Sequence, residues 1–275
     1  MRDDATMIRP PAVAGRFYPG NPSALSAMLD AFMNFPAERQ HAFGIVVPHA
    51  GYIYSGRVAA AVYSRVEIPA RTIVLCPNHT GLGAPLSIMP NGAWQTPLGQ
   101  LQIDVEMCEA LMKSDPQLED DMMAHRLEHA LEVQLPFLQH RRGSDTQFVP
   151  ITVGVSDWNS LERLGKAIGE TVARIDASVL IIASSDMNHY ESDAVTRIKD
   201  AQAIEPMLQR NARDLYDTVR RERISMCGVG PAVSMIVASN LLGAQRSELV
   251  QYATSAEVSK DFDRVVGYAG IIVGN

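Results

Sequence analysis

The chain has 275 residues, of which 47% are hydrophobic and 20% charged, proportions that are ordinary for a globular protein with a sizeable core. Its 24 basic and 31 acidic side chains give a net charge of -7, so we expect no clustered positive surface of the kind that binds nucleic acid. The three cysteines, Cys76, Cys108 and Cys227, form no CxxC pair. Structural disulfides are therefore not expected, and a reducing cytoplasm is the predicted location.

Neither export nor membrane insertion is expected. The N-terminal sequence MRDDATMIRPPAVAG carries acids and prolines where a secretory signal needs a basic start and an apolar stretch. Residues 224–245 carry no charge, but they begin with the loop-like CGVGP and contain several serines. A buried helix that starts near Pro231 explains this segment better than a bilayer span does.

The predicted elements alternate along the chain after an irregular, proline-rich lead-in at residues 9–20. Apolar periodicity and capping residues predict helices, and continuous apolar runs predict strands. In chain order, the first half is predicted to contain a helix opened by Asn21 and Pro22 that ends near Phe35, a strand at 44–47, a helix at 57–66, strands at 71–76, 86–89 and 94–103, and a helix at 105–113. The second half is predicted to contain a helix at 125–139, a strand at 147–153, a helix at 160–175, a strand at 178–184, helices at 193–221 and 231–242, and strands at 248–254 and 264–273.

Strands that are apolar throughout and alternate with helices indicate a mostly parallel sheet with both faces covered. No repeat or low-complexity linker divides the sequence. We therefore predict a single α/β domain over residues 1–275, built as a three-layer α/β/α sandwich.

Histidines follow three of the predicted strands. His49 lies in the stretch GIVVPHAGYIYSG, His79 in TIVLCPNHTG, and Asp186 and His189 in VLIIASSDMNHY. Ligands in open α/β sheets bind outside the carboxyl ends of the strands, so these side chains are expected to meet there. One histidine at a strand end is more often a turn residue, but three in equivalent positions predict a site. Converging imidazoles suit iron, copper, zinc or nickel, and Asp186 is either a further ligand or the group that orients a ligand histidine.

The remaining histidines and cysteines are harder to assign. Cys227 precedes a predicted helix, where the helix dipole lowers a thiol pKa, so it is either a soft ligand, a nucleophile or a buried apolar cysteine. His125, His129 and Glu132 share a helix face, which is expected to be solvated, and His129 is the one most suited to orient a ligand. Leu127, Leu131, Leu135 and Leu138 are predicted on the apolar face of the same helix. His41 and His140 are expected at the surface, and Cys76 and Cys108 in the core.

Seven motifs in order resemble those of the Memo family, whose microbial members are called AmmeMemoRadiSam system protein B. They are AGRFYP, PHAGYIYSG, PNHTG, EHALEVQLPFLQ, SSDMNHY, MCGVGP and YATSAE, and the resemblance covers about residues 9–274. It implies a fold similar to class III extradiol ring-cleaving dioxygenases, with a metal cleft at one edge of the sheet. It also implies a functional association with AMMECR-type and radical SAM proteins.

Carried over by position, the resemblance implies metal-site roles for His49, His79, His189, Asp186 and Cys227, and favours Cys227 as a ligand. It implies pocket roles for Phe17 and Tyr18. One departure is Ala256, which stands where many microbial members have glycine. The larger departure concerns the similarity to the dioxygenases. Those enzymes hold Fe(II) with two histidines and a glutamate, and this sequence has no glutamate in a comparable late loop.

The sequence thus predicts a mononuclear, non-haem metal-binding redox protein of dioxygenase-like type, with iron as the first choice and copper or zinc as alternatives. His49, His79, Cys227 and His189 are the expected ligands, with His189 as an alternative acid/base oriented by Asp186. Residues Phe17, Tyr18, Tyr52, Tyr54 and His129 are expected to line the pocket for a small, aromatic molecule or a peptide. Two other functions remain open: a non-catalytic metal- or peptide-binding protein, and a thiol hydrolase with Cys227 as nucleophile and His189 as base.

Overall fold

The apolar runs of the sequence form the long strands of one sheet. The computed structural model describes residues 7–34, 38–175 and 177–275. The strands in this part of the chain are β1 (Ile8–Arg9), β2 (Ala42–Val47), β3 (Arg71–Pro77), β4 (Leu86–Ile88), β5 (Ala93–Thr96), β6 (Gly99–Ile103), β7 (Glu119–Asp120), β8 (Gln147–Val153), β9 (Val179–Ser184), β10 (His189–Glu191), β11 (Arg246–Thr254) and β12 (Val265–Gly274).

The centre of the sheet is parallel. The main path of strands runs β1-β5-β6-β8-β3-β9-β2-β12-β10, and the neighbours from β6 to β2 are parallel. Strand β12, the last strand in chain order, is antiparallel to β2 and to β11. The central strands are buried almost throughout, which is why they read as continuous apolar runs rather than as alternating patterns.

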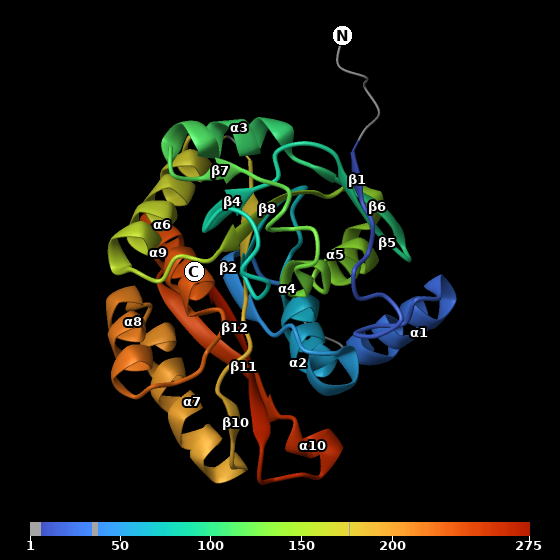
Figure 1. The fold of residues 1–275 in the computed structure, drawn as a ribbon, viewed down its shortest axis with the longest axis vertical. Helices are drawn as coiled ribbons and strands as arrows, with labels where there is room; N and C mark the ends of the chain where they lie inside the picture. The colour runs from blue at the N-terminus through green and yellow to red at the C-terminus, as the bar shows by residue number, and fades with distance from the viewer. Residues whose placement is uncertain (1–6, 35–37, 176) are drawn as a thin grey trace.

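Helices cover both faces of the sheet (Figure 1). The helices are α1 (Pro22–Met33), α2 (Tyr52–Arg65), α3 (Val105–Ser114), α4 (His129–Glu132), α5 (Leu135–Arg142), α6 (Trp158–Ala173), α7 (Asp193–Leu208), α8 (Ala212–Arg221), α9 (Val229–Leu241) and α10 (Ala256–Ser259). Helices α3, α6, α7, α8 and α9 contact one another on one face, and α1, α2, α4 and α5 lie on the other. The predicted three-layer α/β/α sandwich with a mostly parallel sheet is confirmed.

Helices α6 and α9 pack closely because two glycines of α6 face α9. A Cβ atom at Gly165 would lie 2.6 Å from the carbonyl oxygen of Ser234, and one at Gly169 would lie 3.0 Å from the Cβ of Leu241. This close approach holds α9 against β2, β3 and β9, and so fixes the position of the loop that precedes α9. That loop carries Cys227.

Two predicted helices are each divided in the structure. The predicted helix at 125–139 is wrong, because helix begins only at His129 and is interrupted between α4 and α5. Leu127 consequently lies outside both helices and is 56% exposed, contrary to its predicted place on the apolar face. The predicted helix at 193–221 breaks at Arg210, whose φ of 55° is left-handed, and Asn211 caps α8 by accepting a hydrogen bond from Asp214 N.

The first helix begins as predicted, with the Asn21 side chain accepting a hydrogen bond from Ala24 N. It ends at Met33, and its predicted end near Phe35 lies outside the described residues. Among the helices that the structure describes, including the uncharged α9, none is long and apolar enough to cross a bilayer.

Candidate metal centre

Three adjacent strands place the candidate site. Strands β3, β9 and β2 are neighbours in that order, so their carboxyl ends lie side by side. His49 follows β2, His79 follows β3, and Asp186 follows β9, each by two residues. The predicted meeting of these strand ends is therefore a direct consequence of the sheet order.

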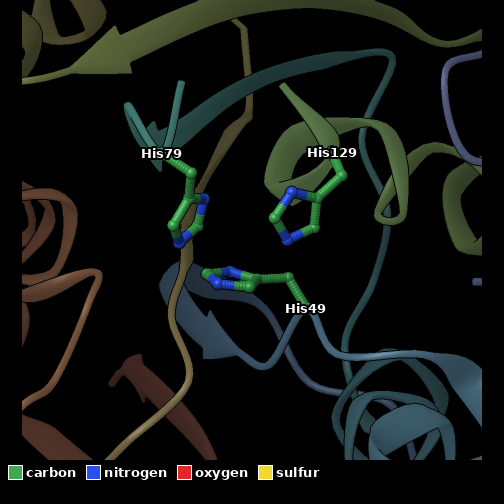
Figure 2. Close-up of side chains that lie close together, drawn as sticks. All are labelled: His49, His79 and His129. Carbon is green, nitrogen blue, oxygen red and sulfur yellow. The ribbon is translucent and has the colours of Figure 1, made fainter. Parts of the chain in front are cut away.

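His49, His79 and His129 form a cluster (Figure 2). Each offers one ring nitrogen, and these three atoms all lie within 4.8 Å of one another. The rings of His79 and His129 stack with centroids 4.7 Å apart, and His49 meets both edge-on, at 5.1 and 5.5 Å. No other group of three histidine, cysteine or acidic ligands this close occurs within residues 7–34, 38–175 and 177–275. His129, expected only to line a pocket or orient a ligand, thus joins two of the predicted ligands.

The hydrogen bonds of His49 define which ring nitrogen carries its proton. Its Nδ1 lies 3.0 Å from Ser184 Oγ. That hydroxyl already donates to the carbonyl of Ala130 and accepts from the Gln134 amide, so Nδ1 of His49 must be the donor. Nε2 is then left without a proton, and its lone pair is available to a metal.

His79 and His129 share one buried carboxylate, that of Glu128. The Nδ1 of His79 donates to Glu128 Oε1 at 2.9 Å, and the Nδ1 of His129 lies 3.4 Å from the same oxygen. The Glu128 side chain is completely buried. Burial alone would raise its pKa, but the hydrogen bonds from the His79 side chain and the Ala130 backbone oppose this effect, and the pKa lies below its ordinary value. The hydrogen bond to this carboxylate keeps the proton of His79 on Nδ1 and leaves the Nε2 lone pair of His79 free to bind a metal.

The neutral imidazoles required for metal binding are favoured. Burial lowers the pKa of His49 well below its ordinary value, and the nearby His79 and His129 lower it further. Burial also lowers the pKa of His129, against the opposing effect of Glu128. Neutral nitrogen donors suit zinc, copper, iron and nickel, so His49 and His129 fit a transition metal without first losing a proton at neutral pH.

The cluster forms one wall of a cavity of about 580 Å³. The other residues that line it include three predicted site residues, Asp186, His189 and Cys227, and one predicted pocket residue, Phe17. The ring of Phe17 lies 4.8 Å, centroid to centroid, from that of His129. The cavity therefore brings together residues from the N-terminal segment, from three strand ends and from the loop before α9.

Cys227 contacts the cluster through His49, with Sγ 3.2 Å from His49 Nε2. The expected low pKa of its thiol is wrong: burial and the nearby Asp186 raise it. The helix that follows, α9, begins only at Val229, and its N-cap residue, Gly228, forms no side-chain capping hydrogen bond. A Cβ atom at Gly228 would lie 2.4 Å from Ser184 O, so only glycine fits where the chain passes the end of β9. Ligation by Cys227 stays a prediction.

Asp186 and His189 line the same cavity but have separate partners. Asp186 Oδ1 accepts the backbone N–H of His49 at 2.7 Å, and burial raises the pKa of Asp186 to about 7. The Nδ1 of His189 faces the carbonyl of Ser225 at 2.9 Å, which fixes Nδ1 as its donor and leaves Nε2 free. The expectation that Asp186 orients His189 is therefore not met, because Ser225 does so. Asp186 instead holds the turn that carries His49.

The predicted tyrosines lie outside the cavity lining. Tyr52 donates its hydroxyl hydrogen to the carbonyl of Val133, and Tyr18 donates to Glu132. Both side chains are buried, and they line a separate cavity of about 200 Å³ on the other side of Phe17. Tyr54 lies in α2 and is 38% exposed. Of the predicted aromatic residues, only Phe17 is placed against the histidine cluster.

Glu132 anchors the N-terminal segment rather than facing solvent as predicted. It is completely buried, forms an ion pair with Arg9, and accepts the backbone N–H groups of Ala12 and Val13 at 2.7 and 3.0 Å. Arg9 also donates to the carbonyl of Glu128. This network ties the segment that carries Phe17 to the segment that carries His129.

His125 is also buried, contrary to the predicted solvated face. Its Nδ1 lies 3.1 Å from Thr152 Oγ1 and its Nε2 lies 3.5 Å from Ser87 Oγ. Burial, followed by the charge of Arg9, lowers its pKa to about 3. Both ring nitrogens face hydroxyls of the core, so His125 takes no part in the cluster.

The sequence reasoning did not find Glu128, Ser184, Ser225 or Gln134. The dipeptide Glu128-His129 carried a usable signal, because a carboxylate beside a histidine is a common way to orient a metal ligand. The other three gave no signal, since Ser184 ends a buried strand and Ser225 and Gln134 act through the fold alone.

Known proteins similar to this chain belong to one family. The family model described as Memo-like protein matches residues 9–272. The chain belongs to the Memo family. It is 40% identical to a MEMO1 family protein of Methanopyrus kandleri, over 97% of this chain and 99% of that protein. MEMO1 family proteins of Aquifex aeolicus and Methanosarcina barkeri are each 42% identical, covering 96% and 97% of this chain and 98% and 100% of their own lengths. The resemblance to the Memo family seen in the motifs is confirmed.

Proposed function

We propose that this Memo family protein binds one transition-metal ion between His49, His79 and His129, with iron as the first choice and copper or zinc as alternatives. The observation that carries the proposal is the approach of the three ring nitrogens within 4.8 Å of one another. Unprotonated Nε2 atoms on His49 and His79 follow from their Nδ1 partners and support it. The carboxylate of Glu128, which contacts His79 and His129, would offset the charge of a cation.

We further propose a redox role of dioxygenase-like type on a small aromatic or phenolic molecule. Three protein ligands beside a cavity leave coordination positions open, which is typical of catalytic rather than structural centres. A bound metal would supply Lewis-acid or redox chemistry at the cluster. The free Nε2 of His189 is placed to accept a proton from a hydroxyl in the cavity, and Phe17 offers an apolar surface to a ring.

The donor set favours a different electronic environment from that of the extradiol dioxygenases. Three histidines stand in place of two histidines and a carboxylate, and Cys227 Sγ lies close enough to His49 Nε2 to be a further ligand of the same ion. A thiolate ligand is softer than a carboxylate and favours copper as well as iron. This is the reason to keep copper as an alternative.

Elemental analysis after anaerobic purification tests metal binding. We expect about one iron or copper per chain in the wild type and little in His49→Ala. His41→Ala is the matched control, because His41 precedes the opposite end of the same strand, β2. Equal metal contents in the wild type and His49→Ala contradict the proposal. Iron-dependent oxygen uptake with catechols tests the redox role, and bound metal without uptake favours a binding role.

A second candidate, thiol-dependent hydrolysis, is favoured by the 3.2 Å contact between Cys227 Sγ and His49 Nε2. The base in this candidate is His49 rather than the expected His189. Burial opposes it, because the pKa of the thiol is raised and that of His49 is lowered. Iodoacetamide labelling distinguishes the two functions: rapid labelling of Cys227 in the metal-loaded protein favours the nucleophile, and labelling only after metal removal favours ligation.

The partners remain proposals that rest on family resemblance. A peptide is an alternative occupant of the cavity, and AMMECR-type and radical SAM proteins are the proposed functional associates. Co-purification from the native host with a tagged chain measures such an association directly.

A further inference from the structure

Glu128 occupies an unusual position behind the candidate metal centre. Its side chain is completely buried, and it precedes α4 as the residue that caps this helix. The carboxylate contacts two of the three clustered histidines, His79 and His129. A buried carboxylate in such a place needs partners for both oxygens.

Four groups face that carboxylate. Oε2 accepts the backbone N–H of His79 at 2.6 Å. Oε1 accepts the backbone N–H of Ala130 and the Nδ1–H of His79, both at 2.9 Å, and lies 3.4 Å from Nδ1 of His129. Glu128 therefore holds the His79 turn, the His79 ring and the start of α4, and it lies beside the His129 ring.

The other two histidines of the cavity are oriented differently. His49 faces a serine hydroxyl and His189 faces a backbone carbonyl, and both partners are neutral. Only His79 and His129 have an anionic partner, and they share it. A carboxylate at Nδ1 makes Nε2 a stronger electron donor to a cation and lowers the cost of placing positive charge at the edges of the two rings.

We propose that Glu128 is the shared positioning residue of the metal centre, accepting Nδ1–H from both His79 and His129 so that both present Nε2 to one ion. The inference rests on the proposed metal-binding function. A glutamine at this position is neutral, so even with its oxygen in the place of Oε1 neither imidazole has an anionic partner, and its amide nitrogen cannot accept the backbone N–H of His79. Both ligands are therefore weakened by one substitution.

Glu132 provides a matched control for this substitution. It lies in the same segment, is equally buried, and accepts four hydrogen bonds or ion-pair contacts, but none of them comes from a histidine. Glu132→Gln therefore perturbs a buried carboxylate network of similar size without touching the ligands. A purely structural role for Glu128 predicts that the two variants behave alike.

The first measurement is the zinc dissociation constant, obtained by competition with a chromophoric chelator on variants whose circular dichroism shows the native fold. We expect Glu128→Gln to weaken zinc binding by about 10- to 100-fold, the range typical of residues that orient metal ligands. Glu132→Gln is expected to stay close to the wild type, and Glu128→Asp to recover part of the loss. Wild-type affinity in Glu128→Gln overturns the proposal.

The second measurement needs no variant and no metal. Long-range ¹⁵N–¹H NMR of the metal-free wild type reports the tautomer of each imidazole. We expect His79 and His129 both to be protonated on Nδ1 and bare on Nε2, and the Nε2–H form at either one overturns the proposal. If the wild type binds neither iron, copper nor zinc, the proposed metal function fails, and this spectrum still decides the role of Glu128.

Discussion

Two histidines four residues apart, His125 and His129, have opposite surroundings. His125 is completely buried, and both of its ring nitrogens face hydroxyls of β4 and β8. His129 begins α4, faces the cavity, and joins two other imidazoles. The comparison shows that residue type and spacing do not make a ligand. A histidine can bind a metal only when one ring nitrogen carries the proton and the other has a lone pair that faces an open space.

The substitution His129→Ala tests the cavity side of this comparison most strongly. Loss of a ligand nitrogen is expected to weaken metal binding by more than the roughly 100-fold that marks the upper range for residues that only orient ligands. Chelator competition measures this effect. The fold should be retained, because the His129 ring is only partly buried and packs against Phe17 and the other two clustered imidazoles rather than in the hydrophobic core. An affinity within threefold of the wild type shows that His129 is not a ligand.

His125→Ala tests the core side. Removing the ring leaves a cavity and two unpaired hydroxyls, which together should lower the free energy of unfolding by about 2–5 kcal/mol. Urea denaturation measures this change. Metal binding per folded molecule should be close to that of the wild type. If His125→Ala is as stable as the wild type but binds no metal, the assignment of His125 to the core rather than to the metal site is contradicted.

The buried His125 should also give the protein a specific acid sensitivity. In the unfolded chain it binds a proton near pH 6.5, whereas in the folded protein burial lowers its pKa to about 3. Between these two pH values the unfolded state binds one proton more than the folded state. The free energy of unfolding is therefore unaffected by this proton above pH 6.5 and decreases as the pH falls toward 3, by up to about 1.4 kcal/mol per pH unit. Stability curves of the wild type and His125→Gln against pH should converge as the pH falls. Parallel curves contradict the assignment.

Phe17→Ala should have the smallest effect. The Phe17 ring lines the cavity and packs against the His129 ring, but it has no atom that can bind a metal. We expect metal affinity to fall by less than about tenfold, since contacts between aromatic rings contribute about 0.5–1.5 kcal/mol. Isothermal titration with zinc measures this change. A loss as large as that in His129→Ala shows that the N-terminal segment builds the site rather than bordering it.

Much of the fold was predictable because the central strands are buried on both faces. Continuous apolar runs identified β2, β3, β8 and β9, and the rule that ligands lie beyond the carboxyl ends of strands brought His49 and His79 together. These predictions depend on local pattern and on a general property of parallel sheets. They needed no knowledge of distant contacts.

The segment around His129 was not predictable by the same reasoning. Its apolar spacing fits one helix from residue 125, but Glu128 caps a helix that starts later, and Glu132 pairs with Arg9 at a sequence separation of 123. That distant ion pair turns Glu132 inward, and the late helix start leaves Leu127 in solvent. Helical periodicity carries no information about either event, so His125 and His129 are both predicted on one solvated face, with a pocket-lining or orienting role for His129 alone.

The most direct test of the account is X-ray absorption spectroscopy of the iron-loaded wild type and of His129→Ala. Multiple scattering from imidazole rings reports how many histidines bind the metal. The account predicts three in the wild type and two in the variant, with a sulfur contribution appearing if Cys227 also binds. Identical histidine counts in the two proteins would contradict it.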